Sequence, residues 1–113
     1  ARKENEKILG EKEFSLMKKS AWLINCARGE VVDQKALTRA LEQKKIAGAF
    51  LDVMESEPFD LSWPLFERDD VVITPHIASN TKECMRLMAV QAAEQIHKVF
   101  SGKKPDWPVN TPL

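Results

Sequence analysis

Apolar residues along the chain occur in two patterns, short continuous runs and longer stretches with helical spacing. The continuous runs span residues 21–26, 46–53 and 71–74, and Pro75 stops the third. Runs of this length without polar alternation are typical of strands that are covered on both faces, as in a parallel sheet. We therefore predict three short, buried, parallel strands.

The stretches with helical spacing lie around and between these strands. The first covers about residues 4–19, where Gly10 separates a short turn from the helix itself. A second helix follows Asp33, which we expect to be its N-cap. The last helix starts near residues 80–81 and stops at Gly102. The apolar positions on one side of that helix are Met85, Met88, Ala89, Ala92, Ile96, Val99 and Phe100.

Strands that alternate with helices predict an open α/β fold with a largely parallel sheet. A chain of 113 residues is expected to form one domain. Residues 54–70, which are rich in Glu, Pro and Asp, are expected to form a loop between the second and third strands. No stretch reaches the roughly 18 apolar residues that a membrane span requires, so no membrane partner is expected.

Charge and cysteine content narrow the class of protein. Seventeen Lys and Arg balance 17 Asp and Glu, and this zero net charge argues against a nucleic-acid partner. The two cysteines, Cys26 and Cys84, are too few for a disulfide framework and lack neighbours at metal-ligand spacing. We expect no metal site and a reduced, cytoplasmic setting. The charged N-terminus lacks the apolar core of a secretory signal and an initiator Met, which favours a processed or excised piece.

Candidate chemistry lies where the predicted strands end, because ligands of open α/β sheets bind outside the carboxyl ends of the strands. Four charged or titratable residues follow those ends: Arg28, Asp52, Glu57 and His76. Arginine can hold a carboxylate with two hydrogen bonds, and histidine exchanges protons near neutral pH. A carboxylate beside the histidine would hold its tautomer and favour its charged form. The set suits carbonyl and hydroxyl chemistry on a small acid.

Spacing alone leaves other roles open for these residues. Arg28 is also compatible with a salt bridge at a strand end, and Asp52 with a helix cap or an ion pair. Glu55 competes with Glu57 for the place beside the histidine. A lone histidine after a strand is more often structural than catalytic, but the convergence with Arg28 and Glu57 favours a functional role for His76. His97, within the last helix, is expected to be a surface or packing residue.

Three consecutive segments resemble the signatures of the D-isomer-specific 2-hydroxyacid dehydrogenases, in particular phosphoglycerate dehydrogenases and glyoxylate/hydroxypyruvate reductases. The segments are INCARGEVVDQKALTRAL, AGAFLDVMESEP and PLFERDDVVITPHIASNT. The resemblance implies an oxidoreductase that transfers a hydride between NAD(P)H and a small 2-keto or 2-hydroxy acid. The identity of the acid and the choice between NAD and NADP stay open.

The resemblance also implies roles for individual residues. Arg28 would bind the substrate carboxylate and carbonyl, His76 would be the general acid/base, and Glu57 rather than Glu55 would pair with His76. The residues expected to contact the cofactor are Cys26, Ala27, Arg28, Asp52, His76, Ile77, Ala78 and Ser79.

The matching part of the family is the second half of a Rossmann-type dinucleotide-binding domain. We expect residues 1–101 to form that half, with a crossover helix from about residue 80. Residues 102–113 are expected to form an extended tail that returns toward a substrate domain. No G-x-G-x-x-G motif is present, so the chain alone is expected to be inactive. The resemblance also implies that the full-length protein is a homodimer. A fragment, a truncated gene product and the ordered part of a longer chain are all compatible with this sequence.

Two other interpretations use the same fold. One is a non-catalytic, NAD-sensing interaction protein, because certain transcriptional corepressors resemble this family and retain its Arg, Glu and His set. The other is an incomplete folding unit with no activity of its own. Hydride-transfer assays separate an enzyme from the corepressor-like alternative.

Overall fold

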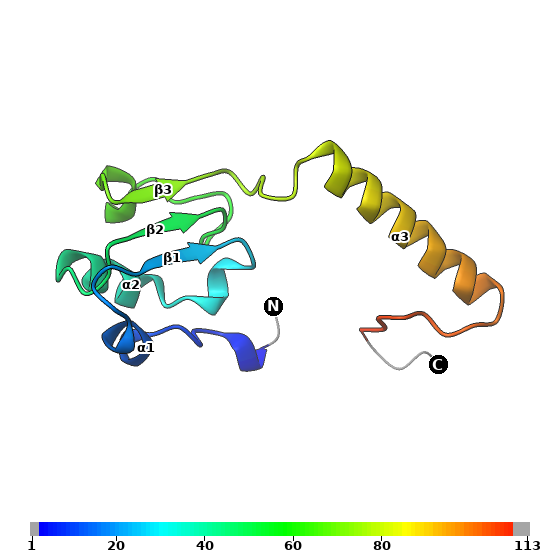
Figure 1. Ribbon diagram of the computed structural model, residues 1–113, viewed down its shortest axis with the longest axis horizontal. Helices are drawn as coiled ribbons and strands as arrows, with labels where there is room; N and C mark the ends of the chain where they lie inside the picture. Colours follow the sequence, from blue (N-terminus) through cyan, green and yellow to red (C-terminus); the bar gives the residue numbers. More distant parts are fainter. Residues whose placement is uncertain (1–2, 110–113) are drawn as a thin grey trace. The chain divides into compact units, whose positions relative to one another are not determined.

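The structure is a computed structural model that describes residues 3–109 (Figure 1). The chain divides into two compact units, Ala1–Ala78 and Ser79–Leu113. The first contains the sheet with its helices, and the second contains one long helix and the segment that follows it. No helix among the described residues is both long enough and apolar enough to cross a membrane.

The sheet of the first unit has three parallel strands in the order β1-β2-β3. Their bounds are Trp22–Asn25 for β1, Gly48–Leu51 for β2 and Val71–Ile73 for β3. In Figure 1 the three arrows point the same way, so the carboxyl ends of the strands meet at one edge. This arrangement confirms the predicted parallel α/β fold.

Two α-helices accompany the sheet, α1 at Glu11–Leu16 and α2 at Gln34–Glu42. Gly10 is the N-cap of α1, and Asp33 is the N-cap of α2, where its Oδ1 accepts a hydrogen bond of 2.9 Å from Ala36 N. Both helix starts therefore agree with the sequence prediction. Short 3-10 helices lie at Lys3–Asn5, Gly29–Val31 and Pro64–Glu67.

The core lies between the two helices and one face of the sheet. Leu37 and Leu41 of α2 and Phe14 of α1 are each 1% exposed, and they belong to one apolar cluster with Leu23 and Leu51 of the sheet. The two helices are therefore held by burial of apolar area against the same face of the sheet.

The second face of the sheet is exposed, contrary to the prediction of strands buried on both faces. Ile24, Phe50 and Val72 lie side by side across the three strands and are 67%, 43% and 44% exposed. The strand sequences are continuously apolar because the side chains on both faces of the sheet are apolar. The prediction is wrong because both α-helices described in the first unit, α1 and α2, pack on the face that carries Leu23 and Leu51.

The second unit is built on α3, Lys82–Phe100, whose N-cap Thr81 accepts a hydrogen bond from Cys84 N at 3.1 Å. The helix ends before Gly102, which has a positive φ of 71°. The described part of the tail folds back along α3, because Asp106 hydrogen-bonds to Gln95 and Lys98. No residue of α3 is buried, although its start and end agree with the predicted helix.

Candidate functional site

Three loops leave the carboxyl edge of the sheet, and they carry most of the predicted site residues. We name them the β1 exit loop (residues 26–28), the β2 exit loop (residues 52–59) and the β3 exit loop (residues 74–78). All three belong to the first unit. Ser79, the last predicted cofactor contact, opens the second unit.

The Asp52 carboxylate holds the β3 exit loop. Its Oδ1 accepts hydrogen bonds from Thr74 Oγ1 at 2.6 Å and from Ile77 N at 2.8 Å. Its Oδ2 accepts a third hydrogen bond from Ala78 N at 2.8 Å. The Thr74 hydroxyl and the two backbone N–H groups hold the pKa of the Asp52 carboxyl below its ordinary value, and nearby His76 acts in the same direction.

His76 lies between the residues that Asp52 holds. Its φ is +55°, a left-handed conformation that is uncommon for a residue with a Cβ, and its N–H donates to Thr74 O at 3.0 Å. Such a backbone persists only where the surroundings enforce it, and it is often found at active sites. The three hydrogen bonds to Asp52 provide that enforcement on both sides of His76.

Glu57 of the β2 exit loop pairs with His76. The Nδ1 atom of His76 lies 3.0 Å from Oε1 and 3.1 Å from Oε2 of the Glu57 carboxylate. Both side chains are about two-fifths exposed. Because the carboxylate contacts Nδ1, the other ring nitrogen of His76, Nε2, is left to meet a ligand.

The alternative carboxylate, Glu55, points elsewhere. Its Oε1 lies 3.4 Å from Lys7 Nζ, in a half-exposed ion pair. Its backbone N–H donates to the side-chain oxygen of Gln34 at 3.0 Å. The geometry therefore brings Glu57 to His76 and leaves Glu55 bound to the N-terminal segment.

A hollow of about 350 Å³ lies beside the pair. Apart from Glu57 and His76, its lining is apolar: Pro58, Phe59, Leu61 and Pro75. A titratable pair against an apolar wall is the common composition of a site that binds a small organic molecule.

The β1 exit loop carries Arg28, whose side chain is exposed and donates from Nη1 to Ala27 O at 2.7 Å. Buried Asn25 shapes this loop, since its side chain accepts from Ala27 N at 3.1 Å and donates to Arg28 O at 3.0 Å. Within residues 3–109 no hydrogen bond or ion pair joins Arg28 to Glu57 or His76. Arg28 therefore shares the edge with the pair without contacting it.

A second hollow, of about 310 Å³, opens over the carboxyl ends of the strands. Three apolar residues of the exposed sheet face line it, Ile24, Phe50 and Val72, together with buried Leu51 and with Thr74. Three predicted cofactor contacts complete the lining: Cys26, Asp52 and Ala78. An apolar wall with a few polar groups at the strand ends fits one ring of a dinucleotide. A glycine-rich turn for the pyrophosphate is not part of this sequence.

Sequence reasoning missed three residues that order this edge, Asn25, Gln34 and Thr74. A signal existed for Asn25 and Thr74, because both are polar residues at the end of an apolar run. No comparable signal marks Gln34, whose side chain reaches a residue 21 positions away.

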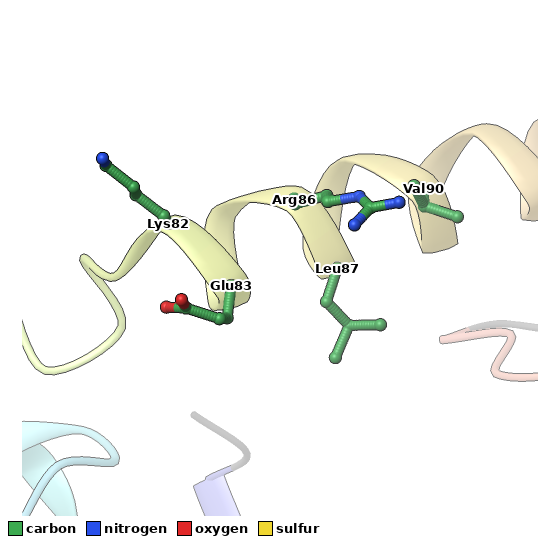
Figure 2. Close-up of a pocket in the computed structure, with 5 residues that line it drawn as sticks. All are labelled: Lys82, Glu83, Arg86, Leu87 and Val90. Atoms are coloured by element: carbon green, nitrogen blue, oxygen red, sulfur yellow. The ribbon is translucent and has the colours of Figure 1, made fainter.

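A further hollow runs along the start of α3 (Figure 2). Its lining side chains are Lys82, Glu83, Arg86, Leu87 and Val90, which all project from the first turns of this one helix. None of them was predicted to carry chemistry. Within the described part of the chain, no group of three or more His, Cys, Asp and Glu side chains is arranged to hold a metal ion.

Comparison with known proteins shows the family of the chain. Residues 1–78 match the family model described as "D-isomer specific 2-hydroxyacid dehydrogenase, NAD binding domain". The chain is 47% identical over 108 residues to a glyoxylate reductase of Thermofilum pendens, covering 96% of this chain and 32% of that protein. It is 44% identical over 105 residues to a D-3-phosphoglycerate dehydrogenase of Methanocaldococcus jannaschii, covering 93% of this chain and 20% of that protein.

Two solved structures extend the comparison. A D-isomer specific 2-hydroxyacid dehydrogenase from Xanthobacter autotrophicus Py2, in complex with NADPH and MES, has a TM-score of 0.84 and 35% identity over 97% of this chain and 45% of its own. A D-lactate dehydrogenase with NAD⁺ from Lactobacillus jensenii has a TM-score of 0.77 and 34% identity over 98% of this chain and 37% of its own. The chain thus spans about a third or less of the two curated relatives. It belongs to the D-isomer specific 2-hydroxyacid dehydrogenase family, and residues 1–78 form part of that family's Rossmann-type NAD-binding domain.

Proposed function

We propose that this chain supplies part of the active site of an NAD(P)-dependent 2-hydroxyacid oxidoreductase, namely the loops at the carboxyl ends of its strands. The observation that carries the proposal is the contact of 3.0 Å between His76 and Glu57 at the carboxyl edge of a parallel sheet. A carboxylate on Nδ1 fixes the orientation of the imidazole and stabilises its charged form. Nε2 is then the atom that exchanges a proton with the substrate.

In the reducing direction, charged His76 donates its Nε2 proton to the carbonyl oxygen of a 2-keto acid while the carbonyl carbon accepts a hydride. NAD(P)H, when bound at this edge, would supply that hydride as the two-electron reductant. The C=O bond becomes C–OH, and solvent returns a proton to His76. In the oxidising direction, neutral His76 accepts the hydroxyl proton of the 2-hydroxy acid.

We assign Arg28 to the substrate carboxylate and carbonyl. The guanidinium is exposed, and one of its N–H groups donates to Ala27 O, which leaves the others for a ligand. A planar guanidinium binds a carboxylate through two parallel hydrogen bonds. Asn25 keeps the β1 exit loop in the shape that presents Arg28 at this edge.

We assign the cofactor to the hollow over the strand ends. The residues that would hold the part of NAD(P) nearest the sheet are Cys26, Ala27, Arg28, Asp52, His76, Ile77, Ala78 and Ser79. Three of them, Cys26, Asp52 and Ala78, line that hollow. The similar structures that contain NAD⁺ and NADPH support either cofactor.

We further propose a small 2-keto or 2-hydroxy acid as substrate, supported by the names of the two relatives, glyoxylate reductase and D-3-phosphoglycerate dehydrogenase. A homodimeric full-length protein and a cytoplasmic location belong to the same proposal. The chain alone is expected to be inactive, because the glycine-rich turn that binds the pyrophosphate is not in this sequence.

A chimera tests the proposed function. In this chimera, the matching segment of the Thermofilum pendens glyoxylate reductase is replaced by this chain. The assay follows the oxidation of NADH and of NADPH in the presence of glyoxylate. We expect turnover, and we expect His76→Ala to reduce it by at least about a hundredfold. His97→Ala, which removes an exposed histidine on α3, is the control and should leave the rate unchanged.

Two results would contradict the proposal. One is a folded chimera that binds NADH without reducing a 2-keto acid, which favours the corepressor-like alternative. The other is turnover that is insensitive to His76→Ala, which removes this histidine from acid/base catalysis.

A further inference from the structure

Each exit loop is held by a different buried polar side chain. Asn25 and Gln34 are 5% exposed and Asp52 is 4% exposed. Asn25 binds the β1 exit loop, Asp52 binds the β3 exit loop, and Gln34 binds the β2 exit loop, which carries Glu57. A buried polar side chain of this kind costs free energy unless its hydrogen bonds are made, so each of these contacts is a strong constraint on its loop.

Gln34 is itself firmly anchored. It is the first residue of α2, directly after the N-cap Asp33. The Asp33 side chain accepts a hydrogen bond from Ala36 N at 2.9 Å. The backbone N–H of Asp33 donates to Leu9 O at 2.9 Å. The base of the Gln34 side chain is therefore fixed by both the helix start and the N-terminal segment.

The side-chain amide of Gln34 contacts the β2 exit loop at the point where the loop leaves the core. Its side-chain oxygen accepts from Glu55 N at 3.0 Å. On another side of the same peptide, Gly29 approaches so closely that a Cβ there would lie 1.9 Å from Met54 O and 2.5 Å from Glu55 N. The peptide between Met54 and Glu55 is thus held by a hydrogen bond and by direct backbone contact.

Beyond this peptide the loop is exposed until it reaches His76. Among the hydrogen bonds of the described residues, the one from Glu55 N to Gln34 is the only one that holds the main chain between Val53 and Phe59. Glu57 follows two residues later and reaches His76 Nδ1 at 3.0 Å. The direction in which the chain leaves Glu55 therefore determines whether the Glu57 carboxylate reaches the imidazole.

We propose that Gln34 is a positioning residue for the Glu57–His76 pair, acting through the backbone of Glu55. The inference rests on the proposed function for its catalytic meaning. The effect of Gln34 on the Glu57–His76 pair can be measured without turnover. A failure of the positioning role can therefore be distinguished from a failure of the proposed function. If His76 responds to Gln34 while the chimera transfers no hydride, the positioning role stands and the proposed function fails.

The test is a proton titration of the two histidines in the 113-residue chain, labelled with ¹³C at the imidazole and followed by NMR. Every sample also carries Ile24→Lys and Val72→Lys, which put charge on the exposed sheet face and oppose self-association. The carboxylates beside His76 are that of Glu57, 3.0 Å from Nδ1, and that of Asp52, which accepts hydrogen bonds from the N–H groups of Ile77 and Ala78. Glu57→Gln sets the full effect of losing the partner. Gln34→Met keeps the side-chain length and removes the acceptor, and we expect it to move the His76 midpoint to lower pH by at least half of that effect.

Three controls distinguish a specific effect of Gln34 on the Glu57–His76 pair from a general loss of stability. Gln34→Glu keeps an acceptor oxygen and should not lower the His76 midpoint. Thr38→Val removes another buried hydrogen bond of α2, from Thr38 Oγ1 to Gln34 O at 2.9 Å, and should leave the midpoint unchanged. His97, exposed on α3, is the internal reference in every sample.

The proposal is overturned if Gln34→Met leaves the His76 midpoint in place while Glu57→Gln moves it. It is also overturned if Thr38→Val moves the midpoint as far as Gln34→Met does, since the effect would then come from the stability of α2. Amide exchange gives a second measurement: Glu55 N–H should exchange faster in Gln34→Met and at the original rate in Gln34→Glu.

Discussion

At the scale of single residues, the site depends on the contact between one carboxylate and one imidazole. Glu57 contacts Nδ1 of His76 through both of its oxygens, at 3.0 and 3.1 Å. The pair is about two-fifths exposed, so water screens it and its main effect is on orientation and on the charge state of the imidazole rather than on the stability of the fold.

Replacing Glu57 by Gln in the chimera should shift the pH dependence of both reaction directions. Gln keeps the size of Glu but lacks the charge with which a carboxylate stabilises a neighbouring imidazolium. Reduction needs the charged form and should fall off at lower pH than in the parent, whereas oxidation should persist to lower pH. Rates of both directions against pH are the measurement. Glu55→Gln is the matched control, and identical profiles for the parent and Glu57→Gln would remove Glu57 as the partner.

Replacing Arg28 by Lys in the chimera should damage catalysis although the charge is kept. An ammonium group cannot make two parallel hydrogen bonds to a carboxylate. The lost interaction is worth about 1.5–3 kcal/mol, or about ten- to a hundredfold in kcat/KM. Initial rates with 2-keto acids measure the effect, and Arg39→Lys on α2 is the control. A kcat/KM close to that of the parent would exclude Arg28 from substrate binding.

Asp52 links the site to acid stability. Because its pKa in the folded chain is lower than the ordinary value of 3.8, its ionised form stabilises the fold. This contribution is fully present above pH 3.8 and is lost as the pH falls through the lower, folded-state pKa. We expect Asp52→Asn to be less stable at neutral pH and to lose less stability on acidification than the parent.

Urea unfolding of the 113-residue chain at a series of pH values measures this difference. Asp69→Asn, at an exposed aspartate beside β3, is the control and should follow the parent. Parallel pH curves for the parent and Asp52→Asn would show that the three hydrogen bonds to this carboxylate contribute nothing to stability.

At the scale of elements, the sequence predicts features that depend on neighbouring residues, such as the ends of strands and helices. It does not predict features that depend on packing between distant segments. Strand runs, the Asp33 cap and the end of α3 follow from neighbouring residues, and all of these were predicted. The exposure of Ile24 and Val72 was not, because it depends on which elements pack on each face of the sheet.

The same distinction applies within the site. The edge that carries Arg28, Glu57 and His76 was predicted, because parallel strands bring their carboxyl ends together. Spacing left Glu55 and Glu57 as equal candidates for the place beside the histidine. The contact with Gln34, 21 positions from Glu55, turns the chain so that Glu57 reaches His76, and no local pattern encodes it.

The packing of two exit loops against each other predicts the effect of one glycine. A Cβ on Gly29 would meet the Met54 carbonyl oxygen at 1.9 Å, and this neighbour is backbone that cannot rotate away. Gly29→Ala should therefore destabilise the chain by about 1–3 kcal/mol. The midpoint of thermal unfolding is the readout. Gly10→Ala, whose Cβ would have its nearest neighbour at 3.6 Å, is the control; equal midpoints for both variants would contradict the close contact.

At the scale of the whole molecule, the chain presents apolar surface on both of its units. In the first unit this surface is the sheet face with Trp22, Ile24, Phe50 and Val72. It lies next to the outer edges of β1 and β3, with which no other strand pairs within residues 3–109. In the second unit it is α3, of which no residue is buried. Exposed apolar faces and open strand edges favour association with another chain.

We expect the purified 113-residue chain to self-associate at micromolar concentration or to pair with a complementary N-terminal piece. Lysines on the exposed sheet face should oppose this association, because they put charge onto the apolar surface. Light scattering of the parent and of the double variant Ile24→Lys, Val72→Lys measures the effect. A stable monomer for the parent, with no complementary piece present, would contradict this account of the exposed face.

The central claim is that the carboxyl edge of this sheet, with His76 and Glu57, serves hydride transfer to a 2-keto acid. The most direct measurement follows the hydride itself: the chimera is supplied with glyoxylate and with NADH that is fully deuterated at C4, and the product is analysed by mass spectrometry. The account predicts glycolate that carries one deuterium on carbon, formed in the parent chimera and lost in His76→Ala. Glycolate without deuterium, or no glycolate from a folded chimera that binds NADH, would contradict it.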